Sequence, residues 1–175
     1  LSFLDFQEFL NENKDIILYE IKTIKKEYLY DSCIHGYNHN IKVLLFGIYL
    51  CKKLNLNMVD FRIILDACKY HDVGRVNDLY DPKHGILGAK LVDKIIDDPI
   101  YNNVENLKIL KAIIEFHSIP DKYFNNIIKK YQIENIDRFK IVSFILKDAD
   151  NLDRVRLSLN KKTISDLDPN YLRIN

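Results

Sequence analysis

The sequence has almost no net charge, and this shortage excludes several kinds of partner. Its 26 basic and 25 acidic side chains leave a formal net charge of +1. The chain therefore has no overall electric field to attract nucleic acid or an anionic membrane. We expect no membrane association and no strong nucleic-acid binding, and we expect any phosphorylated partner to be held by local groups.

Cysteines and long hydrophobic runs are also scarce. The three cysteines have no C-x-x-C spacing, which favours free thiols in a reducing compartment over a disulfide framework. The longest apolar runs, such as VLLFGIYL, are far shorter than the roughly 20 residues of a membrane span, and the N-terminus does not resemble a secretory leader. These absences predict a cytoplasmic protein. The abrupt ends of the chain leave open that it is a fragment of a longer protein.

No long stretch alternates with period two, so the sequence predicts an all-α fold. Apolar residues recur at steps of three and four, and 47% hydrophobic residues can build a core without disulfides. We expect a single globular domain over residues 1–175, a bundle of about seven or eight helices. The expected helices are residues 4–30 with a break at NENKD, 36–54, 58–72, 85–97, 103–117, 121–131 and 135–157. Asn57 is the predicted cap and Gly74 the predicted stop of the third.

All five histidines lie in or beside these expected helices. One such histidine is usually a residue at the edge of the core that is satisfied by a backbone carbonyl. Five unrelated buried histidines would each need a hydrogen-bond partner, so a shared metal ion is the simpler explanation. Imidazole and carboxylate ligands suit Fe, Mn, Ni, Co or Zn. The five histidines are His35, His39, His71, His84 and His117.

The adjacent pair His71-Asp72 stands at the end of an apolar helix. Neighbouring helical side chains point about 100° apart, so both can reach one cluster only near the helix end, where Gly74 releases the backbone. Asp72 has two carboxylate oxygens and could join two ions, with histidines from other helices on either side.

His35 and His39 stand four residues apart and share one helix face. Their spacing is that of the zinc-protease motif H-E-x-x-H, but Gly36 follows His35, so the general base of that mechanism is missing. We interpret His39 as the better ligand. His35 is left as a supporting residue, a substrate contact or a surface residue.

A further carboxylate is expected from the segment ILKDADNLDRVR. It offers Asp148, Asp150 and Asp153 in an otherwise apolar helix, where acids are hard to bury without a cation. Helical periodicity does not choose among the three, and a solvated position remains open for Asp153.

Taken together, these residues resemble a known family. His39, His71-Asp72 and an aspartate in DADNLD are similar to the H…HD…D signature of HD-domain metal-dependent phosphohydrolases. The segments HDVGR, HGILGA and EFHS resemble the longer version with two further histidines, and the core motifs run over residues 35–156. The resemblance implies hydrolysis of phosphoester or phosphoanhydride bonds by metal-activated water, with a small phosphorylated substrate, usually a nucleotide.

The resemblance also implies roles for single residues. His39, His71, Asp72 and Asp150 would hold one metal ion, with Asp148 as the reserve for the last position. His84 and His117 would hold a second ion or, in members with one ion, act as acid or electrostatic stabiliser near the phosphate. The implied cofactor is therefore one or two ions of Fe, Mn, Ni, Co or Zn, with Mg²⁺ at a second site as an alternative. Asp72, His84, His117 and Arg75 are the expected catalytic residues.

Arg75 stands where many relatives carry lysine, and as a planar donor it suits a phosphate group. Lys83, Arg154 and Arg156 are weaker candidates, since each can equally be a solvated cation. The sequence has no G-Y-P segment of the kind expected in cyclic-di-GMP phosphodiesterases. It is also too short for the synthetase half of bifunctional (p)ppGpp enzymes.

Two other functions fit the same residues: a non-catalytic HD-type regulatory or binding module, and a di-iron oxygenase on the same scaffold.

The apolar stripe at the N-terminus is expected to pack on the core, and a homodimer contact is the alternative. Cys68 is expected only to pack. The stripe consists of Phe3, Phe6, Phe9 and Leu10.

Overall fold

The computed structural model describes residues 3–154 and 172–174, and within these parts all regular secondary structure is helical, as predicted. Three short 3₁₀ segments, η1 (Lys26–Tyr28), η2 (Pro99–Asn102) and η3 (Asp121–Tyr123), join eight α-helices. These are α1 (Phe3–Glu12), α2 (Lys14–Lys22), α3 (Tyr37–Lys53), α4 (Met58–Tyr70), α5 (His84–Ile95), α6 (Val104–His117), α7 (Phe124–Tyr131) and α8 (Ile136–Leu152).

The helix prediction was wrong mainly at the edges of elements. The break at NENKD is confirmed at Asn13, but the expected helix over residues 4–30 ends at Lys22 and is followed by η1. The first three residues of the expected helix 121–131 form η3. The helix expected over 135–157 ends at Leu152, and residues 155–157 lie outside the described residues.

Asparagine side chains begin several of the helices that build the site. Asn57 accepts a hydrogen bond from the backbone amide of Asp60 at 3.0 Å, which confirms the predicted cap of α4. Asn103 and Asn135 cap α6 and α8 in the same way. At its other end α4 stops at Tyr70, four residues before Gly74, so Gly74 is not the stop that the sequence predicted.

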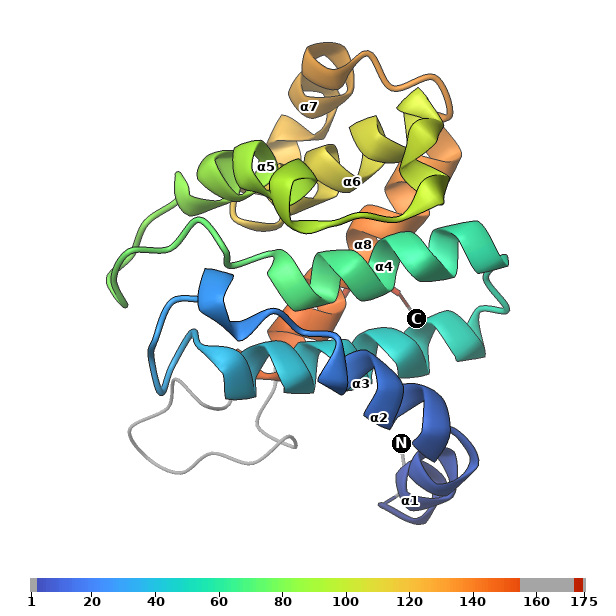
Figure 1. Ribbon diagram of the computed structural model, residues 1–175. Coiled ribbons are helices and arrows are strands. Elements are labelled where there is room, and N and C mark those ends of the chain that lie inside the picture. Colours follow the sequence, from blue (N-terminus) through green and yellow to red (C-terminus); the bar gives the residue numbers. More distant parts are fainter. Residues whose placement is uncertain (1–2, 155–171, 175) are drawn as a thin grey trace.

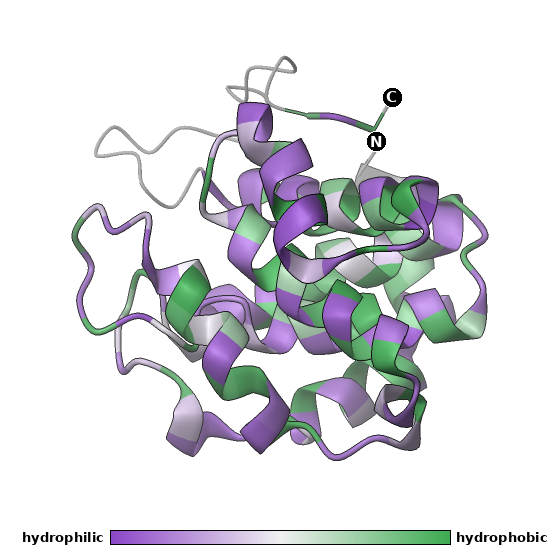
Figure 2. Cartoon of the chain, turned by 90° about the horizontal axis from the view of Figure 1, so that it is seen from above, coloured by the Kyte–Doolittle hydropathy of each residue, from purple (hydrophilic) through white to green (hydrophobic). Residues whose placement is uncertain are grey.

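Helix α8 forms the centre of the molecule. It packs against α3, α4 and α6, while α3 pairs with α4 and α5 pairs with α6 (Figure 1). The sides of α4, α6 and α8 that meet are fully buried, for example at Ile64, Ile113 and Leu146. Most helices carry both hydrophobic and hydrophilic residues (Figure 2), as expected of an amphipathic bundle with one core.

The N-terminal stripe packs on the chain's own helix α3. The ring of Phe9 meets that of Tyr49 edge-on at 5.1 Å, and Phe6 lies 6.0 Å from the same ring. The side chain of Phe3 lies outside the described side chains.

All three cysteines are free, as expected, and Cys68 is buried in the core. Among the described residues no helix is both long and apolar enough to cross a membrane.

Candidate metal centre

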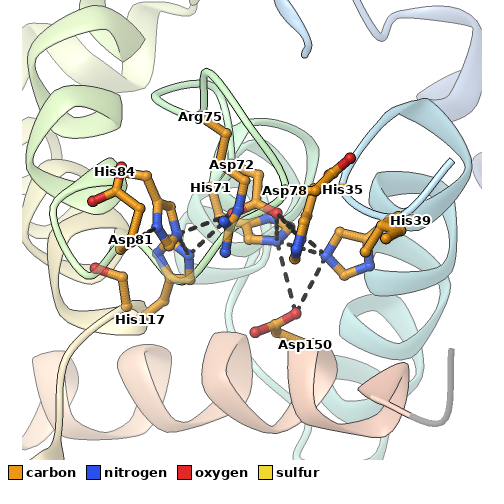
Figure 3. Close-up of polar contacts among 12 residues, drawn as sticks. His35, His39, His71, Asp72, Arg75, Asp78, Asp81, His84, His117 and Asp150 are labelled. Carbon is orange, nitrogen blue, oxygen red and sulfur yellow. Dashed lines mark hydrogen bonds and ion pairs between the residues drawn. The ribbon is translucent and has the colours of Figure 1, made fainter. Parts of the chain in front are cut away.

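All five histidines meet around the carboxylate of Asp72. Its Oδ2 lies 3.3 Å from Nδ1 of His35, 3.6 Å from Nε2 of His39 and 3.7 Å from Nε2 of His71. In Figure 3, His35 and His39 lie on one side of Asp72, and Asp150 reaches toward them from α8. This oxygen of Asp72 therefore faces one half of the cluster.

The other oxygen of Asp72 faces the remaining two histidines. Oδ1 lies 3.1 Å from Nε2 of His84 and 3.5 Å from Nε2 of His117. It also accepts a hydrogen bond from Nε of Arg75 at 3.0 Å. The carboxylate thus stands between two groups of imidazoles, one on each oxygen.

Most of the side chains of this cluster lie at or next to the ends of helices. His71 and Asp72 directly follow α4, His84 is the first residue of α5, and His117 is the last residue of α6. His39 lies in the first turn of α3. A side chain at a helix end can point along the axis, so helices that are themselves apart can bring their polar groups to one place without burying charge along their length.

The two candidate aspartates within α8, Asp148 and Asp150, have different partners. Oδ1 of Asp150 lies 3.3 Å from Nε2 of His39 and 4.0 Å from Nε2 of His71. Asp148 instead accepts hydrogen bonds from the backbone amides of Arg173 and Ile174, both at 2.8 Å. Asp150 is therefore the aspartate of this helix that faces the Nε2 atoms of the histidines.

The backbone fixes where three of the imidazoles carry their proton. Nδ1 of His71 lies 3.1 Å from the carbonyl oxygen of Cys68, and Nδ1 of His117 lies 2.5 Å from that of Ile114. Nδ1 of His84 contacts the carbonyl oxygen of Asp81 in the same way. Because a carbonyl can only accept, each Nδ1 must donate, and in the neutral ring each Nε2 is left with a lone pair.

The Nε2 atoms of four histidines face one another in two pairs. Nε2 of His39 lies 3.1 Å from Nε2 of His71, and Nε2 of His84 lies 2.9 Å from Nε2 of His117. Two lone pairs that face each other repel unless a cation or a proton joins them. Nitrogen atoms at this separation have the spacing of neighbouring ligands on one ion with bonds of roughly 2.0–2.1 Å. The arrangement therefore fits divalent ions.

The ionisation states fit the same conclusion. Burial lowers the pKa of His71 to about 3, so its ring is neutral at neutral pH. Burial alone would raise the pKa of Asp72, but the electrostatic interactions with the surrounding histidines, above all His71, outweigh it and hold the pKa well below the usual value. A neutral imidazole beside an ionised carboxylate is the form in which these groups bind a metal.

Ligand atoms come close enough for metal binding in three overlapping groups. In each group they all lie within 4.8 Å of one another. The groups are His35, His39 and Asp72; His39, His71 and Asp150; and His71, Asp72 and His117.

A cavity of about 330 Å³ opens onto the cluster. Arg75 lies at its wall, with Nε on Asp72 and Nη1 donating to the carbonyl oxygen of Leu79 at 3.3 Å. Leu79 and Tyr80 line the same cavity and are largely exposed, and Arg154 lies at its edge. Lys83 is exposed on the turn before α5, and Arg156 lies outside the described residues.

Two alternatives from the sequence analysis are wrong. His35 is buried beside Asp72 and is not a surface residue. Asp153 is 3% exposed and faces Nδ1 of His39, so it does not lie on a solvated helix face. Its position three residues after Asp150, on the same side of α8, was the signal in the sequence that could have identified it.

Comparison with known proteins agrees with the histidine and aspartate pattern. The model of the HD domain family matches residues 36–155, a range that contains His39, His71, Asp72, His84, His117 and Asp150. No curated protein and no solved structure matches the chain. HD domains bind divalent metals and are generally phosphohydrolases. Since the match covers more than half of the sequence, the chain belongs to the HD-domain superfamily of metal-dependent phosphohydrolases.

Proposed function

We propose that this protein is a phosphohydrolase that uses two divalent metal ions to cleave phosphoester or phosphoanhydride bonds of a small phosphorylated substrate. The observation that carries the proposal is the pair of facing Nε2–Nε2 contacts on the two sides of Asp72. Each pair of nitrogen atoms has the spacing of two ligands of one cation, and one oxygen of Asp72 lies beside each pair.

In this proposal the ligands divide into two sets. His39, His71 and Asp150 would hold one ion together with Asp72, and His84 and His117 would hold the other with the same carboxylate. Both sets contain two imidazoles, which favours Fe, Mn, Ni, Co or Zn over Mg²⁺ at either position. Bound there, such ions lower the pKa of a water molecule and stabilise negative charge on a phosphoryl group.

The chain's own groups then bind and orient the phosphate. Arg75 is held against Asp72 by its Nε, so its positive charge stays at the wall of the cavity, where it can stabilise the phosphoryl oxygens. His35 lines the same cavity and lies beside Asp72. A neutral imidazole there can accept a proton from the attacking water on a ring nitrogen.

The mouth of the cavity supports a substrate with an apolar part. Leu79 and Tyr80 are 75% and 91% exposed and line the cavity opposite a strongly polar floor. An exposed aromatic ring beside a phosphate site suits stacking against a nucleobase. We therefore propose a nucleotide or a related molecule as the substrate.

Metal content and turnover test the proposal together. Protein purified without chelator is expected to contain about two ions per chain, measured by elemental analysis. His71→Ala should lose metal and reduce kcat/KM by more than about 100-fold, because even the groups that only support ligands cost 10- to 100-fold. The control is Asp148→Asn, which alters a buried carboxylate of α8 whose partners are Arg173 and Ile174 and should keep both the metal and the turnover.

A substrate screen separates the proposal from its alternatives. Nucleoside mono-, di- and triphosphates, dinucleoside polyphosphates and sugar phosphates are assayed with each metal. Hydrolysis of nucleotides with a higher kcat/KM than of sugar phosphates supports the proposal. Metal binding without any hydrolysis would favour the regulatory module, and metal-dependent consumption of dioxygen would favour the oxygenase.

A further inference from the structure

His39 differs from His71, His84 and His117 in what holds its Nδ1. This atom lies 2.8 Å from Oδ2 of Asp153, a residue 114 positions later in the sequence. Asp153 is the C-cap residue of α8, and its side chain is 4% exposed. Its other oxygen lies 3.4 Å from Nζ of Lys42. A buried carboxylate is therefore aimed at the far side of a proposed ligand.

The position of His39 in its helix explains why a carboxylate is needed. The rings of His71, His84 and His117 use the carbonyl three residues before them. These carbonyls lie in the last turns of α4 and α6 or in the turn before α5, where the backbone hydrogen bonds of the helix leave acceptors available. Three residues before His39 is Gly36, whose carbonyl already accepts from the backbone amides of His39 and Asn40 and from the Asn40 side chain. This carbonyl has no room for a fourth donor.

We propose that Asp153 is a positioning residue that keeps the proton of His39 on Nδ1 and so presents the lone pair of Nε2 to the metal. The proposal rests on the metal centre described under the proposed function. An ionised carboxylate accepts hydrogen bonds and donates none. With the proton on Nε2 instead, an N–H group would point at Nε2 of His71 3.1 Å away, and His39 would be lost as a ligand.

The first experiment determines which ring nitrogen of His39 carries the proton. Ring ¹⁵N chemical shifts of His39 in the chelator-treated full chain report which nitrogen carries the hydrogen. The wild-type protein should show Nδ1–H. In Asp153→Asn, whose amide can turn its NH₂ group toward the ring, the equilibrium should move toward Nε2–H. A wild-type His39 with its proton on Nε2 overturns the proposal, whatever the variants do.

The second experiment measures metal affinity without turnover. Calorimetric titration of the chelator-treated chain with Mn²⁺ or Zn²⁺ should give a Kd for Asp153→Asn that is roughly 10- to 100-fold weaker than that of the wild type. Asp148→Asn is the matched control, because it changes a buried carboxylate on the same helix whose partners are Arg173 and Ile174. It should stay within about 3-fold of the wild-type Kd, a change of about 0.7 kcal/mol.

The outcomes separate this proposal from the proposed function. Equal Kd values for Asp153→Asn and the wild type, with Nδ1–H retained in both, would overturn the role of Asp153. An equal loss of affinity in Asp148→Asn would do the same, because the effect would then come from α8 as a whole. A protein that binds metal and shows the expected shifts but hydrolyses no phosphoester would refute the hydrolase and leave Asp153 as a positioning residue.

Discussion

At the scale of single residues, His71 carries an electrostatic cost that metal binding can relieve. Its side chain is fully buried, its Nδ1 is held by the carbonyl oxygen of Cys68, and its Nε2 faces that of His39. Burial lowers the pKa of the folded residue from 6.5 to about 3. The folded chain therefore resists taking up a proton at this ring that the unfolded chain takes up readily.

This difference predicts that the metal-free protein becomes less stable as the pH falls. Between pH 6.5 and about 3 the unfolded state binds a proton at His71 and the folded state does not, so the free energy of unfolding decreases on acidification by up to about 1.4 kcal/mol per pH unit. Urea denaturation of chelator-treated protein at pH 7, 6, 5 and 4 measures this slope. His71→Asn, which does not titrate in this range, should show a shallower slope; parallel slopes would contradict the assignment.

The identity of single site residues could be predicted only in part. His71 and Asp72 stand out because their adjacency at the end of an apolar helix is unusual, and the family resemblance pointed to Asp150. The spacing from Asp150 hinted that Asp153 faces the same side of α8, but its partner His39 depends on how α3 and α8 cross. The contact of His35 depends on how the segment before α3 lies against the end of α4. Periodicity places a side chain on a face of its own helix but does not say which helix that face will meet.

At the scale of elements, the turn between α4 and α5 determines how the two halves of the cluster meet. Gly74 lies in this turn and does not have a left-handed backbone conformation. Its role is close approach, because a Cβ atom there would overlap the carbonyl oxygen of His84 and the backbone nitrogen of Gly88. The missing side chain lets the start of α5 lie directly against the segment that carries His71 and Asp72.

Gly74→Ala is therefore expected to push α5 away and to destabilise the fold. Overpacking against backbone atoms typically costs about 1–3 kcal/mol, which urea denaturation measures. Metal stoichiometry should also fall, because His84 moves with α5. Gly88→Ala is the matched control: its Cβ would lie 3.1 Å from a methyl group of Ile114 and 3.3 Å from the carbonyl oxygen of His71. It should cost less, and an equal cost would count against the close-approach role of Gly74.

Element positions could be predicted better than element ends. The apolar periodicity and the cap at Asn57 placed most helices within a few residues, and the structure adds caps at Asn103 and Asn135. The end of α4 was misjudged because Gly74 looked like a C-terminal glycine, although what it permits is a contact with α5. This contact is between two helices, so rules for glycine at the end of a single helix cannot predict it.

At the scale of the whole molecule, the cluster joins elements that are far apart in the sequence. His39 comes from α3, His71 and Asp72 follow α4, His84 and His117 come from α5 and α6, and Asp150 comes from α8. The order of these residues along the chain allowed the family to be predicted, and the family match over residues 36–155 confirms it. That order says nothing about the cavity wall, where Leu79 and Tyr80 come from the turn between α4 and α5.

Because five helices contribute to one centre, metal binding should stabilise the whole fold. An ion that binds only the folded state adds about 2.7 kcal/mol when its free concentration is 100 times its Kd. For a chain of this size, about 2–4 °C per kcal/mol converts this to a melting temperature about 5–10 °C higher with metal than after chelation. Scanning calorimetry of the same preparation before and after chelation measures the shift. The shift should persist in Asp148→Asn and become smaller in His71→Ala, which removes a ligand of one of the two ions. An equal wild-type melting temperature before and after chelation would show that no metal holds these helices together.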